Sequence, residues 1–170
     1  MAALVAILCL PAVTPAAGAK ATYATFNLGG RFGTGAYAIN DSGTVTGDYG
    51  YTSEQAHGFL RTPDGTITTF DPPDSTSTLP MGINSAGSIV GLYYGGSSGS
   101  GFIRSPDGTF TAFGVPDALT YPRSINLKGE VTGFYEGSDG VQAFVRSAKG
   151  KITKIIPTGS TETSTFSINS

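Results

Sequence analysis

The chain has 170 residues, with 10 Lys or Arg against 12 Asp or Glu and a net charge of −2. This balance argues against nucleic acid as a partner, because neutralising phosphates requires a clustered basic surface. Only 13% of the residues are charged, which excludes a disordered polyelectrolyte, and the 25 Gly, 10 Pro, 8 Tyr and 10 Phe are typical of an all-β protein with many tight turns.

Residues 1–19 are predicted to be a signal peptide. Ala2–Leu10 is an apolar run with the length of a signal-peptide core, too short to span a bilayer. Small residues at 17–19 suit a signal peptidase, so we expect cleavage before Lys20 and a secreted, extracellular protein. The alternative interpretation is a buried N-terminal strand. Cys9 is the only cysteine, so the mature chain would have none for a disulfide, a thiolate metal site or a nucleophile.

The remainder, 20–170, is predicted to be a single domain built from an internal repeat. Equivalent asparagines recur 44, 42 and 43 residues apart, at Asn40, Asn84, Asn126 and Asn169. Equivalent arginines recur 43 and 42 residues apart, at Arg61, Arg104 and Arg146. Such a period is typical of four-stranded propeller blades. We divide the chain into three repeats and a partial fourth, at about 36–78, 79–120, 121–163 and 164–170.

Each repeat is predicted to form four short strands, which in the first repeat are 36–40, 44–49, 57–62 and 66–71. Asn-x-x-Gly links the first two strands: Asn caps the turn through its side chain and Gly takes the positive φ of a bulged hairpin. Pro-Asp-Gly or Ala-Lys-Gly links the last two. Ile67 and Phe70 lie on opposite faces of the fourth strand, so both faces of the sheet require burial.

These patterns predict an all-β fold, a partial β-propeller of about three four-stranded antiparallel blades. Residues 22–28 and 164–168 are expected to be incomplete terminal strands. A closed propeller requires at least four blades, so two interpretations remain open. Either the sequence is truncated within a longer ring, or a complete half-ring self-associates through its open sheet edges and uncovered faces.

The repeat resembles the bacterial extracellular HAF repeat family, which is named for a His-Ala-Phe triplet. The shared pattern is Ile-Asn-x-x-Gly-x-Val/Ile-x-Gly, then the triplet, an Arg and an Asp-Gly turn. The triplet reads His-Gly-Phe at 57–59, Ser-Gly-Phe at 100–102 and Gln-Ala-Phe at 142–144, so Phe is its constant member. The resemblance covers about 36–170. It implies a secreted, propeller-like bacterial protein of undefined function, with no catalytic residues to carry over.

Binding is expected where the repeats differ. The links between the second and third strands, and those between successive repeats, lie at one end of the blades and vary in sequence, as binding loops on a rigid frame do. We predict the ligand contacts to be Tyr51, Tyr94, Tyr121 and Arg123, because Tyr rings suit a glycan or a protein. The alternative is that these rings fill gaps between blades. No membrane partner is expected after signal cleavage.

The predicted function is a non-enzymatic binding or surface scaffold, and no catalytic residue, metal or cofactor is expected. Arg61, Arg104 and Arg146 are predicted to brace their own hairpins, for instance against Asp64 or Asp107. The alternative function is a secreted hydrolase or lyase acting on polysaccharide, which would need two carboxylates converging in one cleft. Candidate carboxylates at the variable end are Glu54, Asp74, Asp117, Glu136 and Asp139. A purely architectural, self-associating surface module is a third possibility.

Overall fold

The computed structural model describes residues 24–29, 33–50, 52, 55–95 and 98–169, so the predicted signal peptide lies outside the described residues. Sheet 1 consists of β1 (Gly33–Ile39), β2 (Val45–Gly50), β3 (Ala56–Arg61) and β4 (Ile67–Phe70). Sheet 2 consists of β5 (Ser77–Ile83), β6 (Ile89–Gly95), β7 (Ser98–Arg104) and β8 (Phe110–Phe113). Sheet 3 consists of β9 (Leu119–Ile125), β10 (Val131–Gly137), β11 (Gly140–Arg146) and β12 (Ile152–Ile155).

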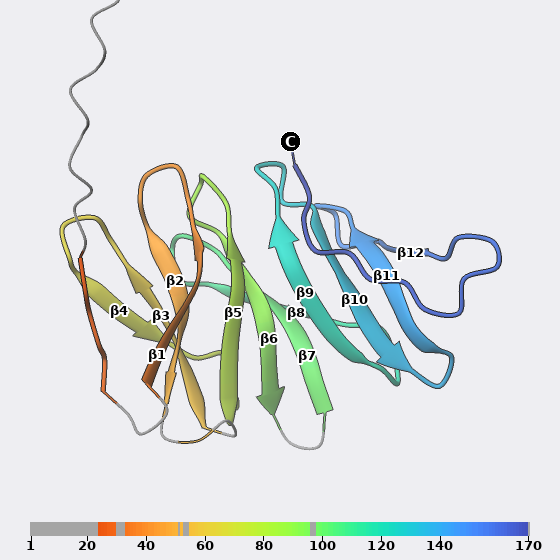
Figure 1. The fold of residues 1–170 in the computed structure, drawn as a ribbon, viewed down its shortest axis with the longest axis horizontal. Coiled ribbons are helices and arrows are strands. Elements are labelled where there is room, and N and C mark those ends of the chain that lie inside the picture. The colour runs from red at the N-terminus through yellow and green to blue at the C-terminus, as the bar shows by residue number, and fades with distance from the viewer. Residues whose placement is uncertain (1–23, 30–32, 51, 53–54, 96–97, 170) are drawn as a thin grey trace, which may run out of the picture.

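The three sheets are antiparallel, keep their strands in chain order and stand side by side in an arc (Figure 1). The first strand of each following sheet lies across three strands of the preceding one: β5 contacts β1, β2 and β3, and β9 contacts β5, β6 and β7. The described residues contain no helix, and therefore none that could cross a membrane. The prediction of a partial β-propeller with three four-stranded blades is confirmed.

The predicted strands of the first repeat match β1 to β4 within three residues at each end. The largest difference is at β1, which begins at Gly33 instead of residue 36. Gly33-Thr34-Gly35 carries little intrinsic strand preference, and its pairing with β2 makes it a strand. For the same reason, the predicted repeat boundaries at 79 and 121 fall two residues inside β5 and β9.

The short hairpin turns lie together at one end of the sheets, here called the turn end, at the top of Figure 1. The side-chain carbonyl of Asn40 accepts a hydrogen bond from the Thr44 N–H at 2.9 Å, and Asn84 and Asn126 repeat this contact at 2.9 Å. Glycines at the ends of both turn types have φ between 79° and 93°, at Gly43, Gly65, Gly87, Gly108, Gly129 and Gly150. The predicted turn chemistry is confirmed.

The same asparagines also join the sheets to one another. The Asn40 side-chain amide donates to the Asn84 carbonyl at 3.1 Å, Asn84 donates to the Asn126 carbonyl at 3.0 Å, and Asn126 donates to that of Asn169 at 3.2 Å. We call this series the asparagine ladder. Each of its first three members therefore stabilises its own turn and the next repeat together, which explains why Asn and not another turn residue recurs.

The core between the sheets repeats as well. Phe59, Phe102 and Phe144 are fully buried on the third strands. Each makes an edge-to-face contact with a Phe that precedes its sheet, at centroid distances of 5.7 Å to Phe26, 6.3 Å to Phe70 and 6.3 Å to Phe113 respectively. Such contacts add to the free energy of burying each ring. Hydrophobic packing therefore runs continuously from one sheet to the next.

The recurring arginines lie over the same preceding rings. The guanidinium carbon is 5.2 Å from the Phe26 ring for Arg61, 5.0 Å from Phe70 for Arg104 and 4.9 Å from Phe113 for Arg146. Each arginine also donates to the carbonyl of the residue after it, as predicted for a hairpin brace. The predicted partners Asp64 and Asp107 are wrong, because no ion pair to them exists within the described residues. Each carboxylate accepts from its own turn instead.

A bulge in every first strand explains the glycine of the Val-x-Gly pattern. The strand pairing slips at Tyr37, Met81 and Arg123, which are equivalent positions. Opposite each bulge, a Cβ on the second strand would lie 1.9 to 2.3 Å from a carbonyl oxygen of the first, at Gly47, Gly91 and Gly133. No side chain fits there, so glycine is required by the close approach of the two strands.

The links between successive sheets are less variable than predicted. Residues 74, 117 and 159 are equivalent and have positive φ of 60°, 57° and 82°. Each lies in a turn closed by a backbone hydrogen bond, from Ser75 to Pro72, from Ala118 to Val115 and from Ser160 to Pro157. Asp and Gly tolerate this left-handed conformation, so one turn is built from different residues.

Candidate functional site

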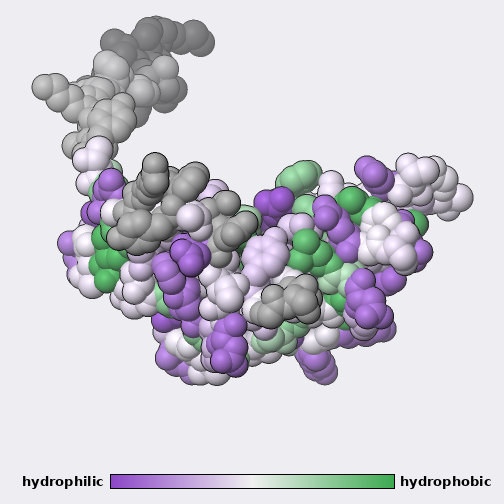
Figure 2. Space-filling model, turned by 90° about the horizontal axis from the view of Figure 1, so that it is seen from below, coloured by the Kyte–Doolittle hydropathy of each residue, from purple (hydrophilic) through white to green (hydrophobic). Residues whose placement is uncertain are grey.

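The other end of the sheets, here called the loop end, carries the links between second and third strands and those between sheets, at the bottom of Figure 1. Figure 2 views this end and shows small hydrophobic patches separated by hydrophilic side chains.

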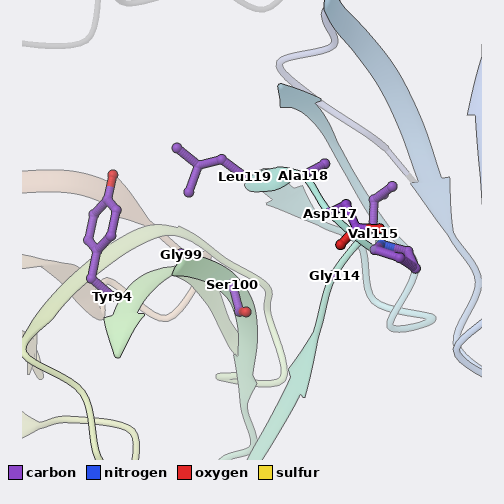
Figure 3. Close-up of a pocket in the computed structure, with 9 residues that line it drawn as sticks. Tyr94, Gly99, Ser100, Gly114, Val115, Asp117, Ala118 and Leu119 are labelled. Atoms are coloured by element: carbon purple, nitrogen blue, oxygen red, sulfur yellow. The ribbon is translucent and has the colours of Figure 1, made fainter. Parts of the chain in front are cut away.

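A hollow at the loop end lies between sheets 2 and 3 and has a volume of about 640 Å³. In Figure 3, Tyr94 of β6 stands on one side of it, the link 114–118 on the other, and Gly99 and Ser100 of β7 lie between them. A Cβ on Gly99 would lie 2.3 Å from the Leu119 side chain and 3.1 Å from the Tyr94 ring. The absence of a side chain at Gly99 therefore lets Leu119 and Tyr94 approach β7 closely.

An aromatic stack adjoins this hollow on sheet 3. Tyr121 of β9 and Phe134 of β10 are opposite each other and stack with centroids 4.8 Å apart. The guanidinium carbon of Arg123 is 5.2 Å from the centroid of the Phe134 ring. The Tyr121 hydroxyl donates to the Glu136 carboxylate at 3.3 Å.

The side chain of Tyr121 also interacts with that of Tyr94 on the neighbouring sheet. Burial, the charge of Glu136 and the nearby Tyr94 side chain raise the pKa of Tyr121 to about 12. Burial and a neighbouring negative charge both disfavour the phenolate, so Tyr121 stays neutral and can donate a hydrogen bond at physiological pH. Two tyrosines and a carboxylate from two sheets thus meet beside the hollow.

The four predicted contact residues have different fates. Tyr51 lies outside the described residues, Tyr94 lines the hollow, and Tyr121 adjoins it. Arg123 donates to the Met81 sulfur at 3.8 Å in addition to stacking on Phe134, so its guanidinium joins sheets 2 and 3. All three described residues lie on strands and not on loops, contrary to the expectation that loops would carry them.

Sequence reasoning missed Phe134, and it named Glu136 as a candidate carboxylate for the alternative function and not as a partner of Tyr121. Both lie on β10, opposite Tyr121 and Leu119 of β9 respectively, so they are cross-strand neighbours of residues at the site. The predicted hairpin could have indicated them, because the register of a hairpin defines which residues of its two strands lie opposite each other. The bulge at Arg123 shifts that register by one residue and hides the pairing from the sequence.

A second hollow of about 410 Å³ lies at the inner edge between sheets 1 and 2, lined by Tyr37, Asp48 and Leu79 among others. Burial raises the pKa of the Asp48 carboxyl, and a hydrogen bond with the Tyr37 hydroxyl opposes this effect. Burial and the Asp48 charge raise the pKa of Tyr37. Tyr49 also lines this hollow, which thus combines two tyrosines with one carboxylate.

His57 makes the one side-chain contact of salt-bridge length among the described residues, with its Nδ1 2.7 Å from a carboxylate oxygen of Asp71. The other oxygen of Asp71 accepts a hydrogen bond from the Thr78 hydroxyl at 2.6 Å. The pair joins sheet 1 to the start of β5, and both side chains are close to 40% exposed. Neither residue lines any described hollow at the loop end, so we assign the pair a bracing role.

Two of the candidate carboxylates belong to the hollow between sheets 2 and 3, since Asp117 lines it and Glu136 lies beside it through its contact with Tyr121. The hollow between sheets 1 and 2 is lined by Asp48, which was not among the candidates. Asp74 and Asp117 take the left-handed turn position, which explains these two acids structurally. Glu54 lies outside the described residues. Within the described part of the chain, no group of three or more His, Cys, Asp or Glu is arranged to ligate a metal.

No protein-family model and no curated protein matches the chain. Among solved structures, a streptogramin B lyase is 19% identical and aligns over 74% of this chain and 42% of its own, with a TM-score of 0.47. Selenomethionine-substituted virginiamycin B lyase from Staphylococcus aureus is 18% identical over 73% and 42%, with a TM-score of 0.47. A catalytically inactive variant of virginiamycin B lyase from Staphylococcus aureus, with quinupristin, is 17% identical over 74% and 57%, with a TM-score of 0.45.

The alignments thus span about two fifths to three fifths of the length of these lyases. The identities and TM-scores are low, so the assignment of the fold rests on the three stacked sheets described above.

Proposed function

We propose that the chain is a secreted, non-enzymatic binding or surface scaffold module of the HAF-repeat type, and that it binds a carbohydrate at the loop end between sheets 2 and 3. The observation that carries this proposal is the meeting of Tyr94 and Tyr121, from two different sheets, with Glu136 beside an open hollow.

The chemistry of these groups suits a sugar. A tyrosine ring offers a flat apolar surface to the C–H face of a pyranose, and its hydroxyl forms hydrogen bonds at the rim. A carboxylate accepts hydrogen bonds from sugar hydroxyls. Tyr94 is half-buried and lines the hollow, so part of its ring remains available to a ligand. Phe134 supports Tyr121 from behind and limits its rotation.

A polysaccharide hydrolase or lyase has less support. Acid–base cleavage of a glycosidic bond commonly uses two carboxylates within one cleft. The hollow between sheets 2 and 3 is lined by Asp117 as its one acidic residue, and the turn geometry already accounts for Asp117. Glu136, the second acid beside this hollow, accepts the hydrogen bond of Tyr121, so a structural role accounts for each of the two acids, which favours binding without turnover.

The test is a glycan array with the full chain, followed by calorimetric titration of the best ligand. Tyr94→Ala should weaken binding about tenfold or more, since removing one well-packed aromatic contact costs roughly 1.4 kcal/mol. Tyr37→Ala is the matched control, because Tyr37 is 52% exposed and lines the other hollow. Its binding constant should remain unchanged.

A reducing-sugar release assay on the bound glycan separates the two functions. The scaffold proposal expects no product above buffer, and measurable turnover would replace it with the hydrolase or lyase. Failure of every glycan on the array to bind, or equal losses from Tyr94→Ala and Tyr37→Ala, would contradict the proposed site.

A further inference from the structure

The face of sheet 3 that points away from sheet 2 is partly covered in a regular way. At the two complete interfaces, the first strand of the following sheet crosses three strands of the preceding one, and the asparagine ladder joins their turn ends. Residues 163–169 repeat these contacts on sheet 3. The Thr163 N–H donates to the Val141 carbonyl at 2.9 Å, the Thr165 hydroxyl to the Gly133 carbonyl at 2.7 Å, and the ladder ends on Asn169.

Residues 163–169 therefore take the place of a first strand. In Figure 1 this segment runs back alongside sheet 3 towards the turn end, with no strand on its outer side. At the opposite end of the arc, Phe26 takes the place that Phe70 and Phe113 hold elsewhere, and contacts Phe59 and Arg61. Single segments thus occupy the outer positions that two further sheets would fill.

Exposed hydrophobic side chains lie on the uncovered faces at the two ends of the arc, on sheet 1 and beyond sheet 3. Ile39 is 66% exposed on sheet 1, whereas its equivalent Ile125, which follows a complete sheet, is 6% exposed. Beyond sheet 3, Ile156 is 52% and Phe166 69% exposed. Burial of such side chains contributes about 25 cal/mol per Å² of apolar surface, so a further sheet would gain free energy by covering them.

We propose that a two-stranded β-hairpin of the same repeat type docks beside residues 163–169 and completes a fourth sheet on sheet 3. Its chemistry follows from the three existing copies. Its first strand needs a glycine facing the Ser164 carbonyl, since Gly47, Gly91 and Gly133 all face a carbonyl at the equivalent position. Its second strand needs a phenylalanine, equivalent to Phe144, to pack on Ile155.

The proposed interface differs from the existing ones in one respect. Ile155 is equivalent to Phe70 and Phe113, whose rings contact Arg104 and Arg146 respectively. The equivalent arginine of a docked hairpin would therefore have no aromatic ring to stack on. The glycine and the phenylalanine, and not the arginine, therefore determine docking. This inference does not rest on the proposed carbohydrate site, whose hollow is lined by residues between 94 and 119.

The experiment extends the full chain after Ser170 with a second copy of residues 128–146, which supply both hairpin strands in the register set by Asn169. We expect the melting temperature to rise by about 4–8 °C, the shift that roughly 2 kcal/mol produces in a chain of this size. Limited proteolysis should leave the added hairpin intact. The matched control carries Gly133→Val in the added copy alone, and it should melt like the parent chain and lose the added segment to protease.

Two results would overturn the proposal. The first is an extended chain that melts at the parent temperature and loses the hairpin to protease at the rate of the control. The second is a parent chain that light scattering shows to be a dimer which the added hairpin does not dissociate, because a second copy would then cover this face.

Discussion

The turn end and the loop end of the same three sheets differ in how they use repeated residues. At the turn end, Asn40, Asn84 and Asn126 make the same pair of hydrogen bonds, one within the turn and one to the next repeat. At the loop end, equivalent positions hold Tyr94 in sheet 2 and Glu136 in sheet 3. Contacts between repeats therefore constrain the residue types at the turn end, whereas residues at the loop end can differ and provide binding groups.

This comparison shows which sequence differences between the repeats bear on function. The links between sheets vary in sequence, yet they share one turn with a left-handed residue at 74, 117 and 159. Sequence variation there does not produce different shapes. The functional difference between repeats comes instead from strand positions near the loop end, where Tyr121 and Phe134 stack on sheet 3.

Four tests would break or sharpen this comparison, and the largest effect is expected in the core that both ends share. Phe102→Ala should lower the free energy of unfolding by about 3–5 kcal/mol, since Phe102 is fully buried between Phe70 and Phe110. Denaturant unfolding measures this. Phe134→Ala is the comparison at the loop end and should cost clearly less, because Phe134 is half-buried. Equal losses would mean that the site is part of the core.

Asn84→Ala tests the turn end. The substitution removes the hydrogen-bond partner of both the Ser88 N–H and the Asn126 carbonyl. It should therefore lower the free energy of unfolding by about 1–3 kcal/mol. Asn40→Ala should cost less, because its bond to the next repeat is only partly buried. Chemical denaturation of both variants checks the order, and a larger loss at Asn40 would contradict the asparagine ladder.

The titration of Tyr121 tests the geometry of the loop end. Its pKa of about 12 should appear as a late step in the ultraviolet absorbance of the phenolate, and Glu136→Gln should lower this pKa by removing the neighbouring negative charge. Because the folded pKa lies above the usual value near 10, the associated stability is present below pH 10 and is lost as the pH rises towards about 12. An unchanged pKa of Tyr121 in Glu136→Gln would contradict the contact between the Tyr121 hydroxyl and the Glu136 carboxylate.

The smallest effect on folding is expected at Tyr94. Tyr94→Ala should change the free energy of unfolding by less than about 1 kcal/mol, since the ring borders an open hollow and is half-buried. Thermal unfolding beside the glycan titration checks this. A loss as large as that of Asn84→Ala would show that Tyr94 fills a gap between blades.

The sequence by itself determined the local structure of this protein. Asn-x-x-Gly and Asp-Gly specify hairpin turns through side-chain capping and the freedom of glycine at positive φ, and the period near 43 residues specifies four strands to a sheet. These signals are local, so they are readable without knowledge of what lies across a sheet.

Only the tertiary structure decided which residues from different repeats meet. Arg104 lies over Phe70 of the preceding sheet and not beside Asp107 in its own turn, and the bulge at Arg123 brings Phe134 opposite Tyr121. Such pairings depend on how the sheets stack and on a one-residue slip in register, which no pattern within a single repeat encodes. The meeting of Tyr94, Tyr121 and Glu136 arises in the same way, from the contact between two sheets.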